Sequence, residues 1–153
     1  MNRTCTPTKS GKIRAGALHL TQKVDYGLFL LAILAKNDST LPISISVVSK
    51  NNHLSFSFLQ KVANLLKRAD IIMSVRGKDG GYRLSKDPAS IRLKDIIEAL
   101  EGPTQIARCI GFKSGIEDQC PRASFCMVRS GVERMNQEIQ DFYLAKRLTD
   151  FLS

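Results

Sequence analysis

The 153-residue sequence has no tryptophan, only two histidines, and no continuous apolar run of the roughly 20 residues that a membrane-spanning helix needs. Neither His19 nor His53 lies among the clustered cysteines, and the sequence contains no glycine-rich phosphate loop or nucleophile motif. We therefore expect a protein that is neither an enzyme nor a membrane protein. The N-terminal residues also lack the apolar segment of a secretory signal, which predicts a cytoplasmic protein with reduced cysteines.

Acidic residues are scarce in the first part of the chain. Residues 1–86 contain 14 Lys and Arg but only 4 Asp and Glu, a net charge of +10, whereas residues 87–153 contain 9 and 10, a net charge of −1. A charge that served only solubility would not be confined to one part, whereas a surface that binds a polyanion would be. The imbalance predicts a DNA-binding region, and a solvated basic surface without a partner is the alternative.

Apolar residues recur at helical spacing in three segments of the basic region. The first predicts a helix over about residues 21–36 with Thr21 as its N-cap, and the second a short helix over about 44–50. The third helix is expected to be capped by Ser55 and to bury Leu59, Val62 and Leu66. Because only a few residues separate the second helix from the third, the pair has the proportions of a helix-turn-helix.

A hairpin is expected directly after the third helix. Residues 72–75 and 82–84 read as two strands, and the glycines of the segment 78–81 are expected to supply backbone freedom for the turn. A helix of this kind can enter the major groove of DNA while a basic hairpin reaches a minor groove or the phosphates. The residues that we expect to contact DNA are Ser55, Ser57, Gln60, Lys61, Arg76 and Lys78.

The second part of the chain is expected to contain a further helix, a loop and a long last helix. Gly102 and Pro103 end the further helix, and little periodicity remains in residues 103–121. The last helix is expected from about residue 122 to 141 or beyond, with an apolar seam in heptad spacing that favours a homodimer over packing onto the chain's own core. The seam consists of Phe125, Val128, Val132, Met135, Ile139 and Phe142.

The chain is therefore expected to be mostly α-helical, with a winged helix-turn-helix domain and a long C-terminal dimerisation helix. The predicted division is a flexible basic tail (1–16), the DNA-binding domain (17–86), a connecting helix (87–102), a cysteine-bearing loop (103–121), and the dimerisation helix with the C-terminal tail (122–153).

Three cysteines lie in or next to the predicted loop. Ten residues separate Cys109 from Cys120, and five separate Cys120 from Cys126, which differs from the short Cys-x-x-Cys spacing of structural zinc sites. Wider spacing suits an iron–sulfur cluster, which thiolates hold from several directions. Nearby Arg and Lys residues favour thiolates, which helps both metal ligation and oxidation. A zinc site, a thiol–disulfide switch and incidental cysteines are the alternatives, and a thiol oxidoreductase is a remote one.

Three segments of the sequence resemble a known family of regulators. The segments LTQKVDYGLFLLA, SFSFLQKVANLLKRADII and SVRGKDGGYRLSK are similar to winged-helix regulators of the Rrf-two superfamily, which includes the IscR, NsrR and RirA groups. The resemblance covers residues 18 to about 148. It implies a homodimer that binds a pseudo-palindromic operator in double-stranded DNA, with Ser55, Ser57 and Gln60 on the reading helix and Arg76 in the minor groove.

The resemblance also implies a ligand set for a 2Fe–2S or 4Fe–4S cluster. Cys109, Cys120 and Cys126 match the three cysteine positions of the family, although the first gap is longer than in its typical members. Arg129 replaces the histidine that one group uses as a fourth ligand. Asp25 matches the aspartate that the nitric-oxide-sensing group donates from the partner subunit, and a surface or helix-capping carboxylate is its alternative role. We therefore expect a transcription regulator whose operator affinity is set by the cluster in response to a redox or nitric oxide signal.

Overall fold

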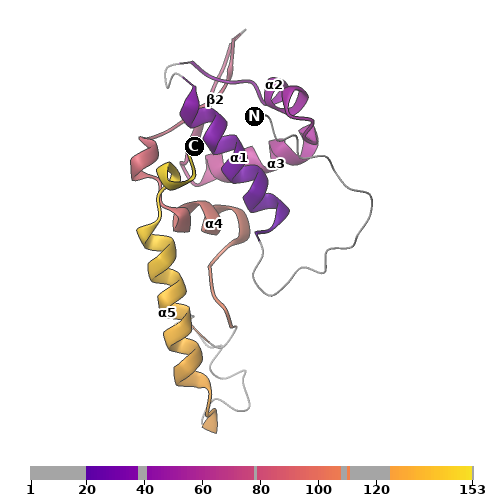
Figure 1. Cartoon of the computed structure of the whole chain (residues 1–153). Coiled ribbons are helices and arrows are strands. Elements are labelled where there is room, and N and C mark those ends of the chain that lie inside the picture. Colours follow the sequence, from indigo (N-terminus) through magenta and orange to yellow (C-terminus); the bar gives the residue numbers. More distant parts are fainter. Residues whose placement is uncertain (1–19, 38–40, 78, 108–109, 111–124, 153) are drawn as a thin grey trace, which may run out of the picture.

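The computed structural model describes residues 20–37, 41–77, 79–107, 110 and 125–152. Helices α1, α2, α3 and α4 form a body with a projecting two-stranded sheet, and α5 extends away from this body (Figure 1). The elements in chain order are α1 (Gln22–Lys36), α2 (Ile45–Asn51), α3 (Phe56–Arg68), β1 (Ile72–Val75), β2 (Gly81–Leu84), the 3₁₀ turn η1 (Pro88–Ser90), α4 (Leu93–Glu101), α5 (Arg129–Ala145) and the 3₁₀ turn η4 (Leu148–Phe151).

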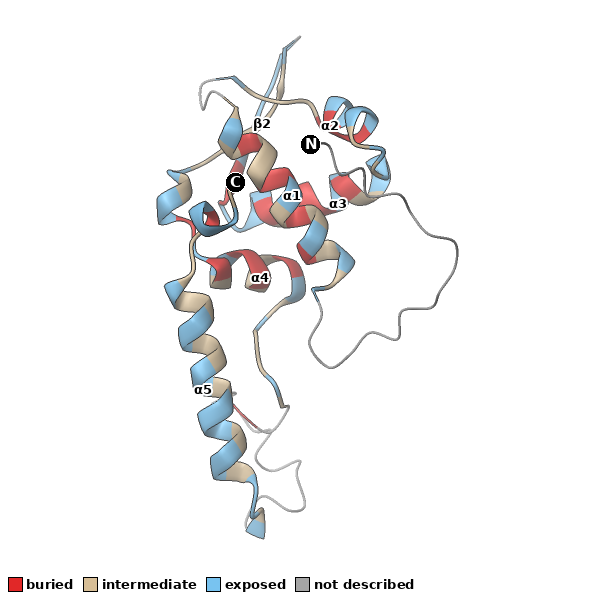
Figure 2. Ribbon diagram, viewed as in Figure 1, coloured by how far each residue is buried: buried red, intermediate tan, exposed pale blue. Residues whose placement is uncertain are grey.

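The hydrophobic core lies where α1, α3 and α4 meet. The Thr21 hydroxyl caps α1 as predicted, because it accepts a hydrogen bond of 3.3 Å from the Val24 backbone N–H. Leu30, Leu59 and Ile96 are fully enclosed, and the buried residues concentrate in the body rather than in α5 (Figure 2). The predicted buried stripe of the third helix is confirmed, since Leu59, Val62 and Leu66 all have no exposed surface. The core thus fixes α3 from behind and leaves its other face to solvent.

The segment predicted as one connecting helix is divided in two. Only η1 and α4 are helical, and the extended residues Ile91 and Arg92 lie between them. The cause is a contact with the C-terminal segment, where Arg92 and Arg147 form an antiparallel bridge and Leu148 N–H donates to Ile91 O at 2.9 Å. Leu148 is fully buried, so the chain after α5 returns to the body and anchors that end of the helix.

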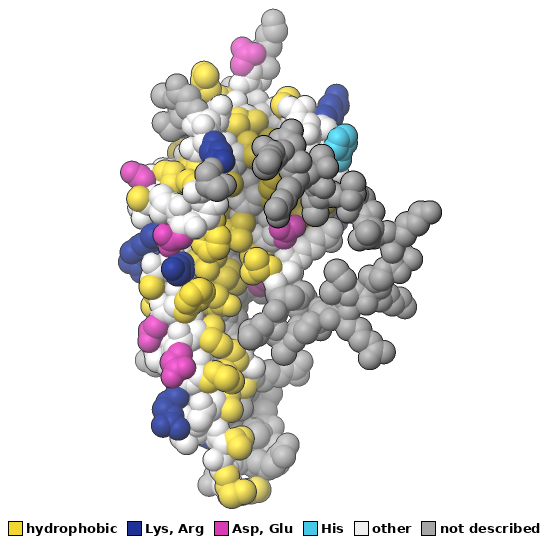
Figure 3. All heavy atoms as spheres, viewed as in Figure 1, with side chains coloured by type: hydrophobic (Ala, Val, Ile, Leu, Met, Phe, Trp, Pro, Cys, Tyr) yellow, Lys and Arg dark blue, Asp and Glu magenta, His cyan; other side chains and the backbone are white. Residues whose placement is uncertain are grey.

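Helix α5 begins later than predicted. It starts at Arg129 rather than near residue 122, so Phe125 and Val128 of the predicted seam precede it. No residue of α5 is buried, and the side chains of Met135 and Phe142 are 49% and 54% exposed. Hydrophobic side chains follow the length of this helix on the face that Figure 3 shows. Among the described residues, no helix is long and apolar enough to cross a membrane.

Candidate DNA-binding surface and cysteine segment

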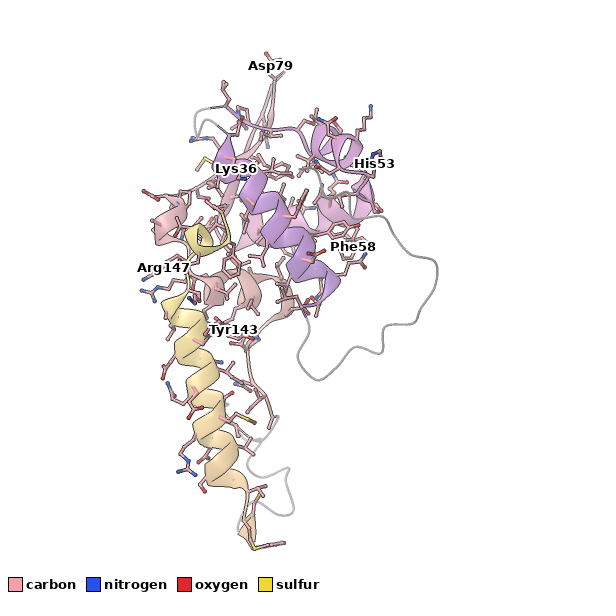
Figure 4. All side chains as sticks on the ribbon, viewed as in Figure 1. Lys36, His53, Phe58, Asp79, Tyr143 and Arg147 are labelled. Carbon is pink, nitrogen blue, oxygen red and sulfur yellow. The ribbon has the colours of Figure 1, made fainter. Side chains whose placement is uncertain are left out.

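The turn between α2 and α3 is held by side-chain hydrogen bonds. The buried Ser49 hydroxyl donates to Leu54 O at 2.7 Å, and the Asn52 side-chain amide donates to Val48 O at 2.9 Å. His53 takes a left-handed backbone conformation with φ of 54°, which lets the chain reverse within a few residues. His53 is therefore a turn residue at the outer edge of the body (Figure 4). These contacts fix the angle between the two helices of the motif.

The predicted reading residues share the solvent face of α3 and its N-cap. Ser55, Ser57, Gln60 and Lys61 are all exposed, whereas the buried residues of α3 lie on the opposite side. The aromatic ring of Phe58 packs edge-on against Tyr26 of α1, with 4.9 Å between ring centroids and 85° between planes. This contact holds the first turn of α3, the part of a recognition helix that contacts base edges.

The predicted capping role of Ser55 is wrong in part. Ser55 occupies the N-cap position, but its hydroxyl makes no cap hydrogen bond to the helix backbone. Its oxygen instead lies 3.3 Å from the Ser57 hydroxyl oxygen, and both side chains are exposed. The two hydroxyls are thus free of the helix backbone and face the solvent together.

The hairpin forms a wing, and Gly80 closes its turn as predicted, with its N–H donating to Gly77 O at 3.1 Å. The left-handed backbone conformation in this turn belongs to Gly77, with φ of 129°. A Cβ on Gly81 would lie 2.4 Å from the backbone carbonyl of Ile43. Ile43 and Tyr82 exchange two backbone hydrogen bonds of 2.8 Å, so Gly81 is needed because another backbone passes against it.

The wing presents basic and polar groups beyond the strands. β1 and β2 pair in antiparallel register from Ile72 with Leu84 to Val75 with Gly81. Arg76 is exposed directly after β1, and none of the ion pairs between described residues includes it. Lys78 lies outside the described residues, and the neighbouring Asp79 marks the far end of the wing (Figure 4).

Sequence reasoning missed four exposed residues of α3. Asn64, Lys67 and Arg68 continue the solvent face that Ser57 and Lys61 begin. The spacing of residues 57, 61, 64 and 68 is four, three and four, a helical period that polar residues can reveal as well as apolar ones. The fourth is Phe56, which is 47% exposed although it is aromatic.

Only one of the three predicted cysteine ligands lies within the described residues. Cys126 is a free, half-buried thiol just before α5, and its carbonyl accepts a hydrogen bond of 3.3 Å from Arg129 N–H. Cys109 and Cys120 lie outside the described part of the chain. Within that part, no three His, Cys, Asp or Glu side chains are grouped closely enough to hold a metal ion.

The cysteine segment, residues 103–126, is attached to α5 at both ends. At the entry, the Gln140 side-chain amide donates to the Thr104 hydroxyl at 2.8 Å, and Ile106 N–H donates to the Asn136 side-chain oxygen at 3.3 Å. At the exit, Cys126 precedes α5 by three residues. The described residues at both ends of this segment therefore contact α5 or lead into it.

The predicted fourth ligand, Asp25, is an exposed residue in the first turn of α1. A carboxylate there also stabilises the helix through its dipole, so the position suits either role.

The start of α1 contacts the end of α4 through Lys23. Lys23 Nζ lies 3.0 Å from Glu101 Oε2 and donates to Leu100 O at 2.9 Å. Thr21 also donates to Glu101, so the start of α1 is tied to the end of α4, which leads into the cysteine segment.

The carboxylate of Glu101 has a lowered pKa. Partial burial raises this pKa, but hydrogen bonds from Thr21 and Lys23 and the positive charge of Lys23 together lower it by more. The charged form of Glu101 is thus the one that holds α1 to α4.

Comparison with known proteins decides the family. The model of the Rrf2 family, described as an iron-dependent transcriptional regulator, matches residues 20–153. The chain belongs to the Rrf2 family. The regulator IscR of Klebsiella pneumoniae is 32% identical over 105 residues, which are 67% of this chain and 64% of that protein.

Two solved structures of CymR share the fold of this Rrf2 member. CymR of Bacillus subtilis, described as its global cysteine regulator, superposes with a TM-score of 0.66 at 27% identity and covers 87% of this chain and 95% of its own. An oxidized form of CymR from Staphylococcus aureus superposes with a TM-score of 0.60 at 30% identity and covers 86% of this chain and 93% of its own. The predicted mostly α-helical winged-helix fold is confirmed, and the chain is a transcriptional regulator rather than an enzyme.

Proposed function

We propose that the chain binds a pseudo-palindromic operator as a homodimer and that the three cysteines set its affinity for that operator. The proposal rests first on the solvent face of α3, where Ser55, Ser57, Gln60 and Lys61 gather at the start of a reading helix. Arg76, exposed on the wing, suits the minor groove, and Lys78 suits the neighbouring phosphates. A regulator of this kind acts on DNA in the cytoplasm.

The homodimer is supported by the apolar surface of α5. Phe125, Val128, Met135 and Phe142 are 68%, 67%, 49% and 54% exposed in the single chain. Met135, Glu138, Ile139, Phe142 and Tyr143 also line an open groove of about 310 Å³ that the apolar side chains of a second α5 would fill. Two copies joined along α5 would present two reading helices, as a pseudo-palindrome requires.

We assign an iron–sulfur cluster to the cysteine segment, held by Cys109, Cys120 and Cys126, with Asp25 of a second copy as the fourth ligand. Support comes from the donor chemistry of three thiols, from the free thiol of Cys126, and from the family's description as iron-dependent. When bound, such a cluster supplies sensitivity to oxidants and nitric oxide. The chain's own part is mechanical, because Thr104 and Cys126 connect the segment to α5 at both ends.

A second candidate keeps the DNA-binding function and omits iron. The cysteines would then act as a thiol–disulfide switch or hold zinc. The structural similarity to CymR, including its oxidized form, favours this reading over an incidental role for the cysteines. Iron and sulfide analysis of anaerobically purified protein separates the candidates, since a cluster requires both elements in matching amounts.

The DNA-binding part is tested by measuring duplex affinity as a function of salt. Binding through several phosphates makes log K fall linearly with log salt, by about 0.9 for each phosphate neutralised. Salt-independent affinity would contradict the proposal and would fit a protein-interaction adaptor instead. Cys120→Ala tests the sensory part, because it should abolish iron binding and fix the operator affinity at one value. Cys5→Ala, outside the cysteine segment, is the matched control.

A further inference from the structure

We propose that Phe56 reads a thymine methyl group in the operator, so that the chain selects its site partly by an apolar contact. The inference rests on the proposed DNA-binding function and names a specificity residue within it. Phe56 is the first residue of α3 and lies between Ser55 and Ser57 in sequence. Residues at this end of a recognition helix are those that reach the edges of bases.

Phe56 is not needed by the core of the single chain. Its side chain is 47% exposed, whereas Leu59, the next apolar residue on that side of α3, is fully buried. The neighbouring Phe58 takes the aromatic packing role through its contact with Tyr26. An aromatic side chain that is half in water at the reading end of a helix therefore remains available for a partner.

The surroundings of Phe56 identify that partner as duplex DNA. Gln60 lies one turn further along the same face, and Lys61, Lys67 and Arg68 make the exposed part of α3 basic. A positively charged surface favours DNA over an apolar protein partner. Within the major groove, the C5-methyl group of thymine is the apolar feature that distinguishes one base pair from the others, and phenylalanine is suited to contact it.

A preference of Phe56 for thymine agrees with the base preferences expected of the other DNA-contacting residues. Gln60 can pair bidentately with adenine, and an arginine in the minor groove prefers the narrow groove of A·T-rich DNA. A thymine under Phe56 would thus form part of a half-site in which several positions are A·T pairs. Such a base preference would distinguish the reading surface from one that only neutralises phosphates, which would show no base preference.

Two measurements test the inference. First, selection of duplexes from a random pool by the wild-type chain should return one thymine in each half-site whose preference is lost in Phe56→Ala and retained in Phe56→Leu. Phe151→Ala is the matched control, because Phe151 is 42% exposed and belongs to η4 rather than to the predicted reading helix. Second, that thymine is replaced by deoxyuridine, which removes only the methyl group.

The wild-type chain should lose about fourfold in affinity for each deoxyuridine, the value expected for one buried methyl group. Phe56→Ala should bind the thymine and deoxyuridine duplexes equally. The inference is overturned if Phe56→Ala selects the same thymine, or if the deoxyuridine penalty is the same in both proteins. If the wild-type chain selects no sequence and binds without salt dependence, the proposed DNA-binding function fails as well. If it selects an operator but Phe56→Ala selects the same thymine, only the inference about Phe56 fails.

Discussion

Glu101 joins α1 to α4 through contacts that depend on its charge. Since its pKa lies below the ordinary value of 4.5, its interactions stabilise the fold above that pH and are lost as pH falls through the lowered value. We expect Glu101→Gln to lower the free energy of unfolding at pH 7 by at most about 1 kcal/mol, because the pair with Lys23 is partly exposed. The deficit should shrink as the pH falls through the lowered pKa of Glu101, as measured by urea unfolding from pH 7 down to pH values below 4.5.

The partner of Glu101 supplies the control. Lys23→Met should reduce stability because it removes the same ion pair with Glu101 and, in addition, the hydrogen bond from Lys23 to Leu100 O. If the effects of Glu101→Gln and Lys23→Met add in the double variant, the two residues are not coupled and the assignment is wrong.

Arg76 is the residue of the wing whose loss should be most visible in binding. We expect Arg76→Ala to weaken operator binding by about 1–3 kcal/mol and to weaken random DNA less, because a groove contact carries sequence information. Competition binding against both duplexes at one salt concentration measures this difference. An equal loss on both duplexes would mean that Arg76 only contacts phosphate.

At the scale of elements, the wing depends on a close backbone approach. Gly81→Ala would place a Cβ 2.4 Å from the Ile43 carbonyl, which cannot move without breaking its bridge to Tyr82. We expect a loss of about 1–3 kcal/mol in the free energy of unfolding and weaker DNA binding. Gly131→Ala on α5 is the matched control, because no atom lies within 4 Å of its Cβ position. The control should be unchanged or slightly more stable, because Gly131 lies in the first turn of α5 and alanine has the higher helix propensity.

The sequence predicts the helices of the body well because their signals are local. Thr21 and the buried stripe of Leu59, Val62 and Leu66 follow from capping preference and from a 3.6-residue period. The division of the connecting helix cannot be predicted from such local signals. It depends on Arg147 and Leu148, which lie far along the chain from Ile91. Backbone contacts between distant residues leave no periodic trace in the sequence.

The candidate site is predicted in type rather than in detail. Polar and basic residues at the start of the third helix identify the reading face, but the exposure of Phe56 requires knowing which apolar residues the core leaves uncovered. The late start of α5 has a similar cause. Phe125 and Val128 continue the apolar seam in the sequence, so periodicity alone extends the helix across them.

At the scale of the whole molecule, α5 contacts residues at the start of the cysteine segment and is continuous with the end of that segment. Its C-terminal end is anchored to the body by buried Leu148. Asn136 and Gln140, in its middle and C-terminal part, bond to residues at the start of the cysteine segment, and Cys126 leads into its N-terminal end. In a homodimer joined along α5, a change in this segment would alter how the two reading helices are spaced. Only the spacing that fits both half-sites binds tightly.

The dimer itself can be tested on the exposed seam. We expect Met135→Glu to leave the body folded, because Met135 is 49% exposed in the single chain, and to raise the dimer dissociation constant by at least about a hundredfold. Sedimentation velocity measures this change. Ser130→Glu, at an exposed position of α5 outside the seam, is the control. A dimer that tolerates Met135→Glu would place the interface elsewhere.

We propose that the state of the cysteine segment sets operator affinity. The most direct measurement is the operator dissociation constant of anaerobically purified protein before and after removal of iron, with Cys120→Ala measured in parallel. We predict a difference of about 5- to 150-fold between the iron-loaded and iron-free forms, the usual range of coupling between two sites, with Cys120→Ala fixed at the iron-free value. Equal affinities for iron-loaded and iron-free protein would contradict the claim.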